Sequence, residues 1–193
     1  MSTSALVDFF ERSFQGDCFP CTRYTPSNTS LCQFGAIDGS GMIRWRPVKR
    51  ALVIQGDVFD ELVETEQREF EFIDQARQFT SGFWCSTIDC WHAYEMLVLD
   101  CGSWNEREYH VKQVHLRSHF AQQRREDFPR SLPLGFSPSG SGCTYSMRLE
   151  DGEVWVEELE GRPTKKAADS LNDFLSGLRH DQVSEEMLDR VFE

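Results

Sequence analysis

Apolar residues at helical spacing mark several segments of the chain. Leu6, Phe9 and Phe10 recur three or four positions apart, which predicts a first helix near residues 5–14, capped by Ser4. The same spacing, each time behind a polar capping residue, predicts three more helices: a short one after Asp57, a long one after Asn105 to about residue 125, and a closing one after Thr164.

Alternating apolar and polar residues predict strands between these helices. The segments are residues 43–46, 83–85, 93–99, 134–136, 143–149 and 154–159, with a hairpin turn at 150–152 between the last two. Residues 15–41 form a long irregular connection that holds only a short strand at 32–35 and a turn at 38–41. Helices and strands do not alternate strictly, so we expect a single α+β domain with a largely antiparallel central sheet flanked by helices, over residues 1–180, followed by an acidic tail, 181–193.

The net charge of the chain argues against some classes of binding partner. The chain has 193 residues and a formal net charge of −12, with a pI near 4.9. A nucleic-acid binder or a protein that docks directly on anionic lipid needs a basic face, so neither is expected. No apolar run is long enough to span a membrane and the N-terminus does not look like a signal peptide, so we expect a cytoplasmic protein.

The acidic charge is concentrated. Residues 57–74 hold eight acids and one base, a net charge of −7, interleaved with Phe59, Phe70 and Phe72. A solvated face is the simplest interpretation. If the fold joins this segment to a second acidic group at 150–160, the result is an acidic surface suited to a basic loop. The candidate partner-binding residues are Asp57, Asp60, Glu61, Glu64, Glu66, Glu69, Glu71, Asp74, Glu153 and Glu157.

Catalytic and metal signals are weak. Cys18 and Cys21 have C-x-x-C spacing, with Cys32 nearby, but no second ligand pair completes a zinc site. His115 and His119 lie one helical turn apart without a carboxylate between them, which favours a histidine hydrogen-bonded to the sheet over a metal ligand. No phosphate-binding loop and no G-x-S-x-G occurs, although a dispersed Ser-His-Asp triad stays open. We expect reduced thiols, no metal, no cofactor and no catalysis.

Seven sequence pieces, in order, resemble the Syd family, the SecY-interacting proteins of the wider SUKH superfamily. They are Trp45-Arg46-Pro47; Phe79-Thr80-Ser81-Gly82-Phe83; Gly102-Ser103-Trp104 with Tyr109; Gln113, Leu116 and His119; Phe128-Pro129 with Leu132; the hairpin from Ser146 to Leu159; and Ala168 to Leu178. The chain departs from the pattern at residues 15–41, at His115 and at 181–193.

The resemblance implies a non-catalytic, monomeric protein at the cytoplasmic face of the inner membrane. It would reach the membrane indirectly, by receiving basic cytoplasmic loops of SecY in an acidic groove, and could monitor or regulate translocon assembly. The superfamily also contains immunity proteins that neutralise toxins, which gives the alternative function.

Overall fold

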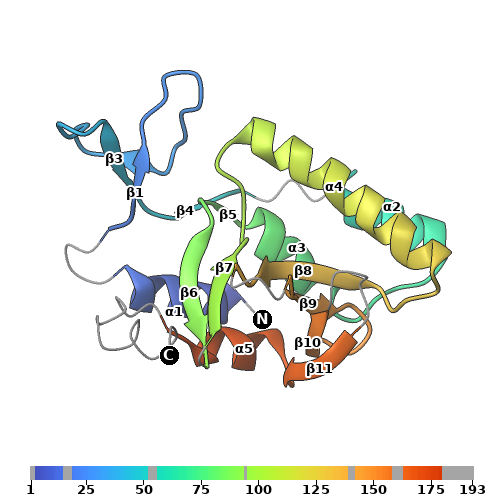
Figure 1. The fold of residues 1–193 in the computed structure, drawn as a ribbon. Helices are drawn as coiled ribbons and strands as arrows, with labels where there is room; N and C mark the ends of the chain where they lie inside the picture. Colours follow the sequence, from blue (N-terminus) through green and yellow to red (C-terminus); the bar gives the residue numbers. More distant parts are fainter. Residues whose placement is uncertain are drawn as a thin grey trace.

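A seven-stranded sheet organises the computed structural model, which describes residues 3–14, 19–51, 56–93, 95–138, 142–157 and 163–179 (Figure 1). The strand order is β11-β10-β9-β8-β7-β6-β12, and every neighbouring pair is antiparallel. This confirms the predicted α+β class. The strands are β6 (Ile88–His92), β7 (Glu95–Leu99), β8 (Ser131–Phe136), β9 (Thr144–Arg148), β10 (Val154–Glu157), β11 (Pro163–Ala168) and β12 (Leu178–Arg179).

The two faces of the sheet differ in character. Leu132, Met147 and Val154 are cross-strand neighbours with no exposed surface, so they mark the core face. Helix α1 (Thr3–Ser13) packs against both α3 (Ile73–Ser81) and α5 (Leu171–Gly177) beside this core. Phe174 of α5 stacks on Tyr145 of β9 with ring centroids 5.5 Å apart. The core therefore lies between the sheet and these three helices.

The long helix α4 (Glu106–Arg125) lies against the opposite face. Its Gln123 side chain donates to Ser131 Oγ of β8 across 2.6 Å. Helix α2 (Val58–Glu66) packs alongside α4, where the rings of Phe59 and Phe120 are 6.0 Å apart (Figure 1). Among the described residues, none of the helices combines the length and the apolar character needed to cross a membrane.

Several predicted boundaries are confirmed by their caps. Asp57 accepts hydrogen bonds from the amides of Phe59 and Asp60 at the start of α2, and Asn105 accepts one from Glu108 at the start of α4. The β9–β10 hairpin turns at residues 150–152 as predicted. Helix α1 begins at Thr3, before Ser4, so Ser4 does not cap it. The predicted tail, 181–193, lies outside the described residues.

The N-terminal third holds more strand than its composition suggested. β1 (Cys21–Arg23), β2 (Gln33–Phe34) and β3 (Met42–Trp45) form a separate small sheet in the order β1-β3-β2, at the upper left of Figure 1. A further short pair joins β4 (Val48–Lys49) to β5 (Phe83–Trp84). Residues 83–85 and 93–99, both predicted as strands, are therefore not partners, since β7 pairs instead with β6.

One helix was not predicted, and one strand was predicted as part of a helix. Residues 73–81 form α3, although the acidic residues before them hid its start. Residues 163–168 form the edge strand β11 on β10, and α5 begins later, after the cap Ser170. Thr164 is consequently not a helix cap. The exposed lysines Lys165 and Lys166 on this edge oppose pairing with another chain.

Candidate functional site

The acids of α2 that face α4 are neutralised within the molecule. Glu61 accepts two hydrogen bonds from Arg117, at 2.5 and 2.6 Å. Glu66 accepts one from Arg124 and one from Arg130, each at 2.9 Å. The bonds from Arg117 lower the pKa of Glu61, and those from Arg130 and Arg124 lower the pKa of Glu66 against the opposing effect of burial. These two carboxylates fasten α2 to α4.

Asp57 is an interior residue, contrary to its predicted place on a binding surface. It is 5% exposed, and its carboxylate accepts from Arg77 Nε across 2.8 Å while capping α2. The same guanidinium reaches Asp60 at 2.6 Å and Asp74 at 3.2 Å. Because both carboxylate oxygens are buried and bonded to the first amides of α2 and to Arg77, Asp57 is not available to a partner.

Glu157 is buried as well, so its prediction as a partner-binding residue does not hold. It is 5% exposed and accepts hydrogen bonds from the hydroxyls of Ser131 and Ser146, both at 2.8 Å. Burial raises the pKa of Glu157, although both hydroxyl bonds act in the opposite direction. Its position on β10 directs the side chain toward the face of the sheet that α4 covers.

Glu153 lies closer to the surface but is also paired. Its carboxylate accepts from Lys166 at 3.1 Å and from the Trp155 indole at 2.9 Å. The Lys166 bond and the Trp155 bond lower the pKa of Glu153. Glu153 therefore stabilises the pairing of β10 with β11.

The remaining acids form an exposed group around the connection from α2 to α3. Glu64, Glu69 and Glu71 are exposed, and none has an ion-pair partner in the part of the chain that the structure describes. Asp74 shares Arg77 with other acids, yet its side chain is 83% exposed. Asp60 points toward α3, and Glu64 follows it by one helical turn on that side of α2.

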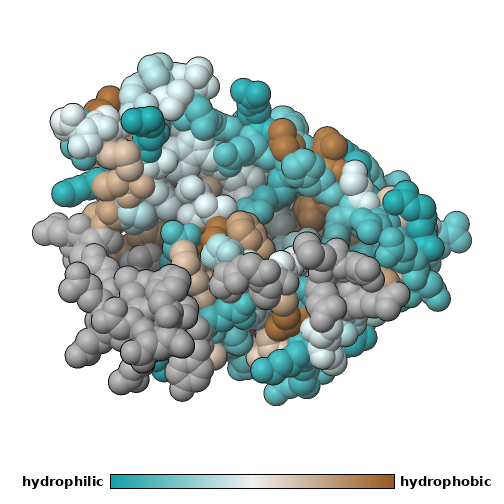
Figure 2. All heavy atoms as spheres, viewed as in Figure 1, coloured by the Kyte–Doolittle hydropathy of each residue, from teal (hydrophilic) through white to brown (hydrophobic). Residues whose placement is uncertain are grey.

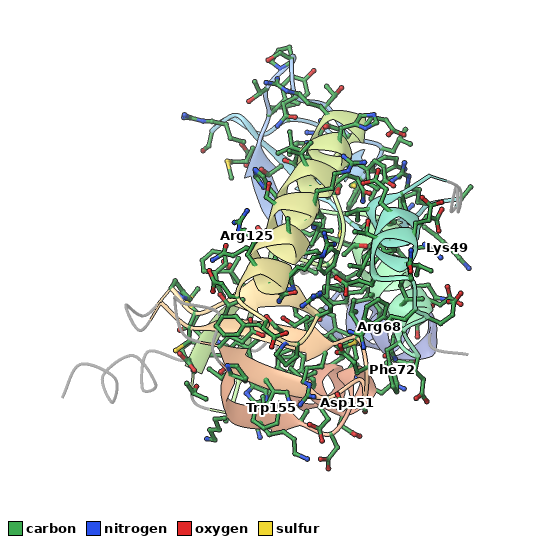
Figure 3. The ribbon with its side chains drawn as sticks, turned by 90° about the vertical axis from the view of Figure 1, so that its right-hand side faces the viewer. Lys49, Arg68, Phe72, Arg125, Asp151 and Trp155 are labelled. Carbon is green, nitrogen blue, oxygen red and sulfur yellow. The ribbon has the colours of Figure 1, made fainter. Side chains whose placement is uncertain are left out.

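The two acidic segments of the sequence meet at this place. Arg68 pairs with Glu150 across 2.8 Å, and the Phe72 amide donates to Leu149 O at 3.1 Å. Gly152 packs so closely on Phe72 that a Cβ there would lie 2.5 Å from the ring. Figure 3 shows Arg68 and Phe72 beside Asp151. We call the exposed acids here the acidic edge, made of Glu64, Glu69, Glu71, Asp74 and Asp151.

A groove of about 410 Å³ lies on the other side of α4 and was not predicted. Helix α4 forms one wall with Val111, Lys112 and His115, and β8 forms the other with Pro133 and Phe136. Asp100, Ser103 and Glu108 contribute polar groups to its lining. The one sequence signal was an apolar residue on the polar side of the helix: Val111 is 47% exposed.

The histidine and cysteine positions do not assemble a metal site in the described ranges. His119 Nε2 lies 3.0 Å from Ser131 O, so the predicted bond from this histidine to the sheet is confirmed. Cys32 is buried, and its thiol sulfur accepts a hydrogen bond from the Ser30 hydroxyl, whereas Cys21 is exposed. Cys18 lies outside the described residues.

Comparison with known families decides the relationship of the chain. The model of the family described as Syd protein (SUKH-2) matches residues 3–180. The chain belongs to the Syd family. A protein Syd from Psychromonas ingrahamii is 25% identical over 178 residues, which cover 90% of this chain and 92% of that protein. Another, from Shewanella frigidimarina, is 25% identical over 187 residues, covering 92% and 82% respectively. The matched residues include all five described helices and every described strand of the central sheet.

Proposed function

We propose that this Syd-family protein is a non-catalytic, monomeric binding protein that docks on basic cytoplasmic loops of SecY through the acidic edge. It would thereby sit peripherally on the cytoplasmic face of the inner membrane, with the protein partner as its only membrane contact, and monitor or regulate the translocon there. The observation that carries the proposal is the meeting of the two acidic segments at residues 68–72 and 149–152, beside which the exposed carboxylates of the acidic edge lie.

The ion pairs within the protein divide the candidate residues into acids with a cationic partner and acids without one. Glu64, Glu69 and Glu71 face solvent and have no cationic partner among the described residues, and so they attract a basic loop over the Debye length of about 8 Å at physiological salt. Glu61 and Glu66 already face arginines. Recruiting them would require a partner to break bonds inside the protein, so their share in binding is expected to be smaller.

One aromatic side chain, Phe72, lies beside the acidic edge. Phe59 and Phe70 are buried, at 0% and 4% exposure, and serve the core. Phe72 is only half-buried between the acids of the connection and Gly152. It can give a partner loop an apolar contact beside the carboxylates, which a charge cluster alone would lack.

Binding to SecY in lipid vesicles tests the proposal. Vesicles with and without SecY are mixed with the purified protein at low salt and at about 0.5 M salt, where surface attraction is screened. SecY-dependent sedimentation at low salt that falls at high salt is expected. Equal sedimentation with empty vesicles would overturn the proposal and leave the toxin-immunity alternative to be tested.

Charge-matched variants locate the surface. Glu69→Lys with Glu71→Lys should weaken SecY binding about tenfold or more, since each reversal turns an attraction into a repulsion. Asp8→Lys with Glu11→Lys changes the net charge equally at exposed positions of α1 and should leave binding nearly unchanged. Equal losses in both variants would show that only the total charge matters.

A further inference from the structure

The small sheet β1-β3-β2 belongs to a basic region of an otherwise acidic protein. Residues 19–51 hold five basic residues and one acid, a net charge of +4, whereas the whole chain has −12. Arg50 pairs with Glu106, but the other four bases are exposed and none has an ion-pair partner in the described ranges. The single acid, Asp38, already accepts hydrogen bonds from two backbone amides at the turn into β3. Figure 2 shows this region at the upper left, where strongly hydrophilic side chains project among apolar ones.

The strand register places two of these arginines on one face of the small sheet. Arg23 is opposite Met42, and Arg44 is opposite Cys21 on one side and Phe34 on the other. Directly opposed residues share a face of a sheet, and so do residues two apart in one strand. All five side chains therefore belong to the same face.

A third arginine joins this face, and the opposite face is packed. The Arg46 guanidinium lies over the Phe34 ring, 5.5 Å from its centroid. On the other side of β3, Ile43 and Trp45 are buried, and the rings of Trp45 and Trp104 are 6.1 Å apart. The small sheet is thus anchored to the start of α4 by one face and presents the other outward. We call the outward face, with Arg23, Arg44 and Arg46, the arginine face.

Strand β1 also offers a free edge beside the arginine face. The Tyr24 amide donates to Gly41 O at 2.9 Å, toward β3. In an antiparallel pair the N–H and C=O of one residue point to the same side, and successive residues alternate, so those of Cys21 and Arg23 point away from β3. No described residue forms a backbone hydrogen bond with them, and both residues are exposed. An edge of this kind can accept an extended segment of another chain as a further strand.

The edge and the arginines together indicate the chemistry of a partner. Pairing with the edge requires the alternating donors and acceptors of a polypeptide backbone, which a lipid headgroup and a polynucleotide lack. Guanidinium groups match carboxylates in shape and charge. A short acidic segment responds mainly to charges within the Debye length of about 8 Å, so the negative charge on the rest of the molecule repels it little.

We propose that the small sheet binds an extended acidic segment of a protein partner as an additional strand along β1, with the carboxylates on the arginine face. Every second side chain of such a strand points to that face, so a segment with acids at alternate positions meets the arginines best. In Figure 1 the small sheet lies at the upper left and α2 at the right, so the site is separate from the acidic edge. The proposal therefore stands whether or not SecY is the partner of that edge.

Fluorescence anisotropy with synthetic peptides tests the proposal. The probe is a fluorescein-labelled octapeptide of alternating glutamate and threonine, titrated with the full-length protein at low salt. Saturable binding is expected, weakened at least tenfold when glutamine replaces glutamate and again when the backbone amides of the original peptide are methylated. No saturable binding, or equal affinity for the methylated peptide, would overturn the proposal. Tighter binding of an eight-residue oligothymidylate, or of phosphatidylglycerol vesicles, would overturn it in favour of nucleic acid or lipid.

Matched variants and amide exchange assign the site. Arg23→Gln with Arg44→Gln should weaken peptide binding at least fivefold, whereas Arg107→Gln with Arg125→Gln removes the same charge at exposed positions of α4 and should leave it nearly unchanged. All four residues are exposed, so both variants should fold. Hydrogen exchange at the Cys21 and Arg23 amides should slow at least tenfold when the peptide binds. Equal losses in both variants, or unchanged exchange at these two amides, would refute the added strand.

Discussion

The Arg77 guanidinium donates to the Asp57 carboxylate across 2.8 Å, and the side chains are only 9% and 3% exposed. Asp57 precedes α2 and Arg77 belongs to α3, so the pair ties the two helices together beneath the acidic edge. Asp60 and Asp74 also reach Arg77. A dense acidic segment can fold here because one buried arginine is shared by three of its carboxylates.

Replacing Arg77 by methionine should be strongly destabilising. The substitution keeps much of the side-chain volume but leaves the Asp57 carboxylate buried without its cation, which should lower the free energy of unfolding by about 3 kcal/mol. Urea denaturation followed by circular dichroism measures the change. The same substitution at Arg125, exposed on α4 (Figure 3), should change it by less than about 0.5 kcal/mol. Similar effects at both positions would contradict the role assigned to the pair.

The sequence predicted Asp57 correctly as a cap and wrongly as a surface residue. Capping depends on local spacing, which the sequence displays, because the carboxylate must meet amides two and three residues later. Its burial depends on Arg77, twenty positions further along, and no local pattern encodes that contact. The same holds for Glu157, which looks like one more acid of a charged hairpin until β8 and β9 supply Ser131 and Ser146.

Strand pairing was hardest to predict for the same reason. Lys165 and Lys166 gave no apolar alternation, so β11 was absorbed into the following helix, although backbone pairing with β10 alone makes it a strand. The long helix α4 was predicted well because its Asn105 cap and its length are local properties. The groove arises between elements distant in sequence, and only the exposed Val111 hinted at it.

The contact between Gly152 and Phe72 should make Gly152→Ala unusually costly. Gly152 has φ +75°, and a Cβ would lie 2.5 Å from the Phe72 ring, so backbone strain adds to a clash with a packed side chain. We expect a loss of about 2–4 kcal/mol in free energy of unfolding. Gly41→Ala is the matched control, since Gly41 has φ +78° with nothing within 4 Å, and should cost only about 1–2 kcal/mol. Adding Phe72→Leu should recover part of the loss at Gly152 but none at Gly41.

Glu157 should give the protein a measurable pH dependence of stability. Its pKa is raised in the folded state above the unfolded value of about 4.3, so the folded protein holds a proton that the unfolded chain releases first. The stabilising contribution of protonated Glu157 is present below that unfolded pKa and is lost as pH rises through the folded pKa. Glu157→Gln should therefore gain stability relative to the parent as pH rises from 4 to 7, as measured by thermal melts in a pH series. Glu64→Gln, at an exposed position, should show a constant difference, and the same constant result for Glu157→Gln would disprove the argument.

The thiols should separate sharply in reactivity. Cys21 is exposed, whereas Cys32, Cys85 and Cys90 are at most 2% exposed. Burial raises the pKa of Cys90 to about 12 and also raises that of Cys32, so little of the reactive thiolate exists at neutral pH. With a thiol-reactive reagent at pH 7.5 and peptide mapping by mass spectrometry, Cys21 should be modified within minutes, and the three buried thiols should follow only once urea unfolds the protein. The Cys90 thiol lies in the core beneath the sheet and donates a hydrogen bond to Leu97 O of β7. Modification of Cys90 in the native protein at the rate of Cys21 would therefore contradict this prediction and show that the strand pair β6–β7 opens readily.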